Sequence, residues 1–226
     1  MLITADLVSG WTLLLGWVVL LPLLVLMARR LSWQRFRDGE LTHVTLGSAV
    51  GLMVFWTLKA GVEPGLSYHL IGAALLTLML GWETALLAIT LVVAGTTVNL
   101  GGDWSALALN VLIKGAVPVA VAHGLLRLAQ GRLPHHIFIY IFVNAFFGAA
   151  LAVLASVLAC AVLLGAAGAY NATYLAQEYV AFAPLMMFGE AWITGMLIAV
   201  LVSYRPRWVQ TFDDHLYLRD HSSDNR

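Results

Sequence analysis

The chain has 226 residues, of which 61% are hydrophobic and only 11% are charged, and its formal net charge at pH 7 is zero. Soluble domains of this size carry far more charged surface, so the composition excludes an ordinary soluble protein, and the balanced charge gives no indication of a nucleic-acid partner. Long apolar stretches recur, each about long enough to cross the roughly 30 Å hydrocarbon core of a bilayer. They are too long and too uniformly apolar for barrel strands. We predict an all-α integral membrane protein that crosses the cell (inner) membrane several times.

Seven hydrophobic segments are predicted as transmembrane helices in one bundle over residues 1–207. In chain order they lie at about 7–28, 41–60, 69–80, 83–98, 105–129, 137–164 and 179–204. The break between the third and the fourth depends on Gly81-Trp82; without it the two segments form one long helix and the count is six. Residues 208–226 are predicted as a polar cytoplasmic tail, partly disordered beyond Leu218.

The arginines set the orientation of the bundle. They cluster after the first, fifth and seventh segments, at Arg29, Arg30, Arg35 and Arg37, then Arg127 and Arg132, then Arg205 and Arg207. Loops rich in Lys and Arg stay in the cytoplasm. Seven crossings with the N-terminus outside and the C-terminus in the cytoplasm place all three clusters on the inner side, whereas six crossings would separate them. We therefore favour seven.

His69 is the first candidate functional residue. It lies in the run Gly65-Leu-Ser-Tyr-His-Leu-Ile-Gly-Ala73, which we expect at the outer mouth of the third helix. Acidic residues of the outer loops, among them Asp6, would raise the local concentration of cations there, or they merely reflect the arginine bias of the opposite side. An imidazole in this position can bind a cation, but spacing alone does not decide whether His69 does.

Lys114 and Glu190 are ionisable residues inside apolar segments, which makes both of them functional candidates. Their opposite charges at similar depth suggest an ion pair that orients two helices, and a role in handling protons or cations is the alternative. Removing one partner of such a pair costs about 3–5 kcal/mol.

Buried amides and small residues are further candidates. Asn110 lies one helical turn before Lys114, and Asn144 lies in the sixth segment. Both are expected to tie helices together, with a ligand role as the alternative. Gly47 and Gly51 have the Gly-x-x-x-Gly spacing that lets helices approach closely, either within the bundle or against a partner subunit.

Enzymatic motifs are absent from the sequence. No glycine-rich phosphate-binding loop occurs, so ATP hydrolysis is expected only in partner subunits. The Gly-x-Ser pattern at Ser67 lacks the second glycine of a nucleophile elbow, and His69 follows too closely in sequence to act as its base. We predict that the chain is not an enzyme and that it holds no tightly bound cofactor.

Three stretches together resemble a known family. The run around His69 is similar to the Gly-Thr-Ser-x-His-Leu-Leu-Gly signature of substrate-binding membrane components of cobalt and nickel energy-coupling factor transporters. Gly102-Asp-Trp-Ser-Ala-Leu-Ala-Leu-Asn110 resembles the family's Gly-Gly-x-x-Ala-Leu-Gly-Ala-Asn stretch, and Gly189-Glu-Ala-Trp-Ile-Thr-Gly195 with Tyr204-Arg-Pro206 resembles its last helix. The stretches occur in the family's order and extend over most of the chain.

The resemblance implies a substrate-specific permease subunit of an energy-coupling factor-type importer. Such a subunit binds a divalent metal ion, cobalt or nickel, from outside. A coupling membrane subunit and two cytoplasmic ATPase subunits complete the transporter. The resemblance also implies seven helices with the N-terminus outside.

The same resemblance implies a metal site that includes the N-terminus. Family members usually begin Met-His, and the free amine, the second backbone nitrogen and the second imidazole bind metal together with the residue matching His69. This chain has Leu2 in place of that histidine. The implied site here is the Met1 amine, the Leu2 amide nitrogen and His69, with Asp6 as a possible oxygen donor. The alternative function is a relative with an altered or lost metal site that transports another small solute or acts without the ATPase module.

Overall fold

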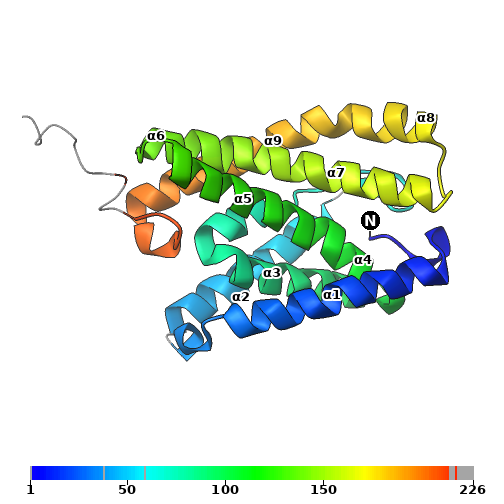
Figure 1. Ribbon diagram of the computed structural model, residues 1–226, viewed down its shortest axis with the longest axis horizontal. Helices are drawn as coiled ribbons and strands as arrows, with labels where there is room; N and C mark the ends of the chain where they lie inside the picture. The colour runs from blue at the N-terminus through cyan, green and yellow to red at the C-terminus, as the bar shows by residue number, and fades with distance from the viewer. Residues whose placement is uncertain (1, 38, 59, 214–216, 218–226) are drawn as a thin grey trace, which may run out of the picture.

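The computed structural model describes residues 2–37, 39–58, 60–213 and 217. These residues form a helical bundle with one short β-hairpin (Figure 1). The first three helices are α1 (Gly10–Arg30), α2 (Gly39–Thr57) and α3 (Ala73–Asn99), and the hairpin of β1 (Ala60–Glu63) and β2 (Leu66–Tyr68) precedes α3. The remaining helices are α4 (Leu107–Val111), α5 (Val117–Arg132), α6 (Ile137–Ile139), α7 (Gly148–Ala166), α8 (Ala172–Tyr174) and α9 (Ala183–Tyr204).

Short π-helical turns join several of these helices into longer rods. The turn Leu112–Ala116 joins α4 to α5, and the turn Tyr140–Phe147 joins α6 to α7. Within the described residues, five helices or rods are long and apolar enough to cross a membrane: Gly10–Arg30, Ala73–Asn99, Trp104–Arg132, Ile137–Ala166 and Ala172–Tyr204. The prediction of an all-α membrane bundle is therefore confirmed.

The predicted break in the third helix lies at Gly81. Its φ of 80° and ψ of 162° are not helical, and they divide α3 into residues 73–80 and 82–99. A positive φ is available to glycine at little steric cost, which explains why the chain can turn sharply here. Just before the turn, the carbonyls of Leu78 and Met79 accept hydrogen bonds from the C-terminal segment. The observed helix is thus either one kinked helix or two, as the sequence left open.

Two helix starts differ from the sequence-based expectation. α3 begins at Ala73 and not at His69, because a β-hairpin and an extended link precede it. The last rod begins at Ala172, well before the expected Tyr179, where the side chain of Asn171 caps the first turn. Helix ends are the least certain part of any sequence pattern, because caps and tertiary contacts decide them.

α3 lies at the centre of the bundle and α1 at its edge. Of the 18 consecutive residues that are most hydrophobic in each helix, 67% are buried in α3 and 17% in α1. Leu15, Val18 and Val19 of α1 remain more than half exposed, as expected for side chains that face lipid.

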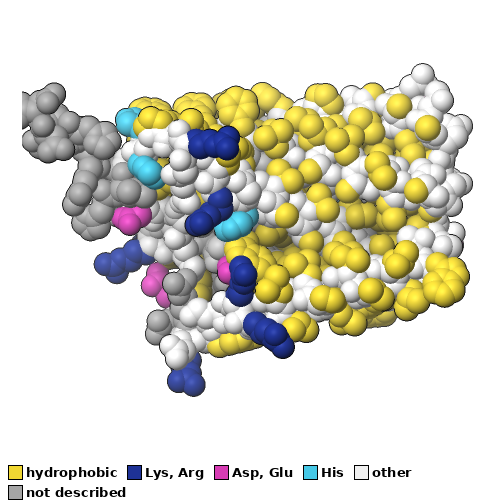
Figure 2. Space-filling view, viewed as in Figure 1, with side chains coloured by type: hydrophobic (Ala, Val, Ile, Leu, Met, Phe, Trp, Pro, Cys, Tyr) yellow, Lys and Arg dark blue, Asp and Glu magenta, His cyan; other side chains and the backbone are white. Residues whose placement is uncertain are grey.

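The arginines gather at one end of the bundle. On the face drawn in Figure 2, Lys, Arg and His side chains lie at one end, and the remaining surface is largely hydrophobic. The Arg30 guanidinium, at the end of α1, lies 6.0 Å from the ring of Trp82. The ring of Trp82 in turn lies 6.3 Å from that of His123 in α5. This shared arginine-rich end agrees with the distribution expected from seven crossings; the orientation in the membrane stays a prediction from the positive-inside rule.

The beginning of the expected polar tail packs on the bundle. Val209 and Phe212 are buried, and the backbone N–H groups of Gln210 and Thr211 donate to the carbonyls of Met79 and Leu78 at 2.9 and 3.4 Å. The disorder predicted beyond Leu218 concerns residues 219–226, which lie outside the described residues.

Candidate functional site

The N-terminal segment inserts into the bundle (Figure 1). Leu2 and Ile3 are buried, and Asn110 holds this segment from the other side. The N–H of Ile3 donates to Asn110 Oδ1 at 2.8 Å, and Asn110 Nδ2 donates to the carbonyl of Ile3 at 2.9 Å. An amide that both accepts and donates matches the two hydrogen-bonding groups of one backbone residue. Asn110 therefore fixes the N-terminus, whereas the sequence predicted that it ties two helices together.

His69 lies in the link between β2 and α3 and is only 8% exposed. Its Nδ1 lies 3.1 Å from the carbonyl oxygen of Leu70, which can only accept a hydrogen bond. Nδ1 therefore carries the proton, and in the neutral ring Nε2 presents its lone pair. The hairpin and the link after it leave this residue buried just before α3, and its place at the outer mouth of the third helix stays a prediction.

The amino group of Lys114 forms a hydrogen bond with the lone pair on His69 Nε2. Its Nζ lies 2.8 Å from His69 Nε2, and the side chain is 6% exposed. Lys114 belongs to the π-helical turn between α4 and α5, a departure from regular helix that is frequent at functional sites. Trp56 packs beside both groups, with its ring centroid 4.4 Å from that of His69 and 5.9 Å from Lys114 Nζ.

A small cavity adjoins the His69–Lys114 pair. Its volume is about 20 Å³, enough for roughly one water molecule. Its lining combines polar and apolar side chains: Ser67, Tyr68, His69, Ile71, Ile113, Lys114, Val153, Ser156, Val157, Cys160, Tyr179 and Met186. A site of this size suits a single small ion, with little room for an organic molecule.

Glu190 supports the segment that carries His69. Its carboxylate accepts hydrogen bonds from the N–H groups of Ile71 at 2.8 Å and Gly72 at 2.5 Å, and the side chain is 2% exposed. These donors lie at the start of α3, where backbone N–H groups have no partner within the helix. The sequence suggested that Lys114 pairs with Glu190; the structure gives the two residues separate partners, because the helix start supplies donors that the sequence pattern does not reveal.

The other candidates lie apart from the cavity. Asp6 is exposed in a 3-10 turn, and the side chain of Leu2 belongs to the hydrophobic core. Met1 lies outside the described residues. Asn144 is 1% exposed, and its Oδ1 has no hydrogen-bond partner within the described part of the chain.

Gly47 and Gly51 face open space. A Cβ built at either position would meet no other described atom within 4 Å. Close packing inside the bundle is therefore not their role in this structure. Docking of a partner subunit against this part of α2 stays a prediction.

The donor set at His69 is incomplete when side chains alone are counted. No three His, Cys, Asp or Glu side chains come together among the residues that the structure describes. A metal ion bound at His69 would need backbone or terminal nitrogens, as the N-terminal ligands implied above would provide.

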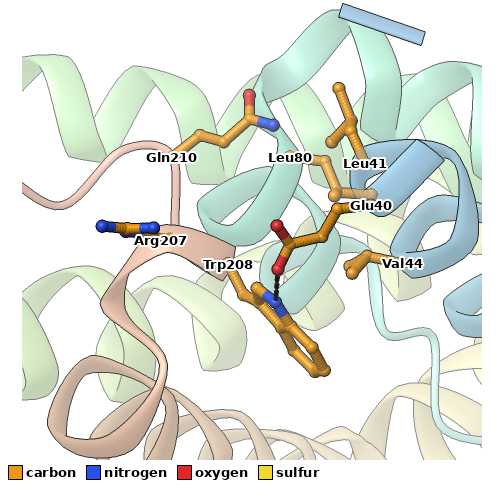
Figure 3. Close-up of a pocket in the computed structure, with 7 residues that line it drawn as sticks. All are labelled: Glu40, Leu41, Val44, Leu80, Arg207, Trp208 and Gln210. Carbon is orange, nitrogen blue, oxygen red and sulfur yellow. Dashed lines mark hydrogen bonds between the residues drawn. The ribbon is translucent and has the colours of Figure 1, made fainter. Parts of the chain in front are cut away.

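A second hollow of about 420 Å³ lies at the arginine-rich end (Figure 3). It is lined by Glu40, Leu41, Val44, Leu80, Arg207, Trp208 and Gln210. Trp208 Nε1 donates to Glu40 Oε1 at 2.8 Å, and this bond joins the C-terminal segment to the start of α2. Two further hollows, of about 300 and 500 Å³, share lining residues with it. Sequence reasoning missed this region, because its residues come from three distant stretches.

Comparison with known proteins identifies the fold. Residues 3–208 match the model of a family described as "cobalt uptake substrate-specific transmembrane region". A solved "truncated transition metal transporter" superposes with a TM-score of 0.77 at 21% identity, covering 90% of this chain and 99% of that one. A second solved "transition metal transporter" has a TM-score of 0.77 at 22% identity and covers 90% and 93% of the two chains. No curated protein sequence matches the chain.

Proposed function

Because the chain belongs to the family of cobalt uptake substrate-specific transmembrane proteins, we propose that the buried pocket at His69 binds its cargo. The chain is the substrate-specific membrane subunit of an importer of the energy-coupling factor type. The proposed cargo is one divalent transition-metal ion, cobalt or nickel. The ion binds to His69 Nε2 together with nitrogens of the N-terminal segment.

The main support for this proposal is the orientation of the His69 ring. The hydrogen bond from Nδ1 to the Leu70 carbonyl directs the lone pair of Nε2 toward the Lys114 side of the pocket. Metal-binding histidines commonly donate their second ring nitrogen to a carbonyl or carboxylate in this way, which fixes the ring and raises its basicity. Imidazole nitrogen is a favoured ligand of cobalt and nickel.

The clamp between Asn110 and Ile3 supports the same site. It holds Ile3 inside the bundle, and Ile3 follows the two residues whose nitrogens, the Met1 amine and the Leu2 amide, are the proposed further ligands. The dimensions of the cavity suit one ion with few water molecules. Donors of this kind explain how a site can bind metal without a cluster of side chains.

The coupling membrane subunit and two ATPase subunits are the proposed partners. The sequence has no phosphate-binding loop of its own, so the energy for uptake must come from other chains. The hollows at the arginine-rich end, which we place in the cytoplasm, offer a surface for such contacts.

A second candidate function is transport of another small solute, or activity without the ATPase module. Two observations favour it: Leu2 stands where the family has a second histidine, and Lys114 occupies His69 Nε2. A purified chain that binds neither cobalt nor nickel, and that isolates without coupling or ATPase subunits, would support this candidate.

The experiment that tests the cargo site is metal binding by the purified full-length chain. Equilibrium dialysis against cobalt or nickel chloride, followed by elemental analysis, should give about one ion per chain. His69→Ala should weaken binding by more than about tenfold, because it removes the oriented imidazole that lines the pocket. The matched control is Ser156→Ala, which lines the same cavity but whose hydroxyl donates to the Ile113 carbonyl at 2.8 Å. Unchanged binding in His69→Ala would remove this residue from the site.

A further inference from the structure

We infer that Lys114 is a built-in competitor of the cargo: its amino group holds the lone pair of His69 Nε2, so that an ion binds only when Lys114 leaves. This inference rests on the proposed function, since it concerns the same nitrogen. It goes further by assigning to Lys114 the role of setting the affinity of the site.

The hydrogen-bonding pattern of His69 prevents Lys114 and a metal ion from binding Nε2 at the same time. With Nδ1 donating to the Leu70 carbonyl, Nε2 has one lone pair, and Lys114 Nζ lies 2.8 Å from it. An amino group can only approach this lone pair as a donor, and a metal ion needs the same electrons. His69 can therefore bind Lys114 or the cargo but not both.

The pocket is too small to hold a metal ion while the Lys114 side chain stays in place. The free volume beside the pair is about 20 Å³, and both side chains are more than nine-tenths buried. An ion that enters while Lys114 stays in place would also meet a positive charge at close range in a poorly screened environment. Cargo binding consequently includes a movement of the Lys114 side chain.

Trp56 holds the amino group of Lys114, the competitor of the cargo, in place beside His69. Its ring lies against His69 and within 5.9 Å of Lys114 Nζ, which is within the range of a cation–π contact. The pair is thus held on two sides before any cargo arrives. Each ion has to overcome the same displacement cost, so ions with weak intrinsic affinity for nitrogen ligands fail to bind at ordinary concentrations, and those high in the affinity order still do.

The test compares cobalt binding by the wild-type chain, Lys114→Leu and Lys114→Gln. Leucine offers no donor to Nε2, and glutamine keeps a neutral donor. The expected order of affinity is Lys114→Leu first, then Lys114→Gln, then wild type, with a gain of about tenfold or more for leucine, because a buried hydrogen bond to a charged group is lost from the competing state. The double variant His69→Ala/Lys114→Leu should not show this gain. Ser203→Ala is the control outside the cavity, since its exposed hydroxyl donates to the Ala199 carbonyl at 2.8 Å, and circular dichroism with gel filtration verifies the fold of each variant.

The outcomes separate this inference from the proposed function. A His69-dependent gain in either lysine variant supports the inference, even if the wild-type chain binds too weakly to measure. If the wild type binds cobalt through His69 and both lysine variants bind equally or more weakly, the inference is overturned and the cargo site stands. If neither the wild type nor any folded lysine variant binds cobalt or nickel, both proposals are overturned.

Discussion

The pocket at His69 and the hollow at the arginine-rich end differ in what fills them. The former has about 20 Å³ of free volume, and His69, Lys114 and Glu190 all have partners inside the protein. The latter has about 420 Å³ and is open to its surroundings. The difference teaches that the pocket at His69, if it is the cargo site we propose, has to rearrange to admit an ion, whereas the hollow at the other end is already formed.

Residues 73–80 connect these two regions. Glu190 holds the start of this short arm, and the segment after α9 holds its end through the carbonyls of Leu78 and Met79. The Gly81 turn lets the arm stop there instead of continuing across the bundle. The closed region and the open region thus share one helical arm, and substitutions at the residues that hold it should separate their contributions.

The largest effect is expected from Glu190→Ala. This change leaves two buried backbone donors, at Ile71 and Gly72, without an acceptor. Since each of the two buried unsatisfied donors costs about 1–3 kcal/mol, the free energy of unfolding should fall by about 2–6 kcal/mol. Denaturant unfolding in detergent measures it. The control is Glu178→Ala, which removes an exposed carboxylate from the same rod. An equal fall in the free energy of unfolding there would show that the two hydrogen bonds of Glu190 are not the cause.

A smaller effect, about 2 kcal/mol, is expected from Asn110→Ala. The substitution removes two buried hydrogen bonds to Ile3 and frees the N-terminal segment. Hydrogen–deuterium exchange at the Ile3 amide should become faster, and cobalt binding should weaken with it. Asn144→Ala is the matched control, since Asn144 Oδ1 has no partner among the described residues and less is lost. Unchanged exchange at Ile3 would contradict the clamp.

The smallest effect is expected at the open end, from Trp208→Phe. It removes one exposed hydrogen bond to Glu40, so the stability should change by less than about 1 kcal/mol and cobalt affinity should stay the same. Thermal unfolding and equilibrium dialysis measure the two quantities. A change in affinity of tenfold or more would instead show that the two regions act as one.

The helices could be predicted from the sequence because their apolar runs are long and the bilayer fixes the required length. The break at Gly81 was also visible, since a glycine next to a bulky residue interrupts an otherwise uniform run. The β-hairpin before His69 was not, because its few residues alternate too briefly to form a pattern.

The partners within the site could be predicted only in part. Lys114, Glu190, Asn110 and His69 all stood out as polar residues in or beside apolar segments. Their pairing did not follow, because His69 and Lys114 are 45 positions apart and the fold alone brings them together. Opposite charge favoured Glu190 as the partner of Lys114, but the donors at a helix start compete for a carboxylate and are invisible in a side-chain pattern.

Glu190 has an electrostatic consequence for a cation near His69. The start of a helix carries a partial positive charge from its aligned peptide dipoles, which disfavours any cation close to that end. The α3 arm begins four residues after His69, and Ile71 just before it lines the same cavity as His69, so this partial charge lies near the site. The carboxylate of Glu190 lies on the N–H groups where that charge is concentrated and offsets it. In the proposed function, the buried Glu190 carboxylate thereby makes the potential at the pocket more favourable for a positive ion without contacting that ion.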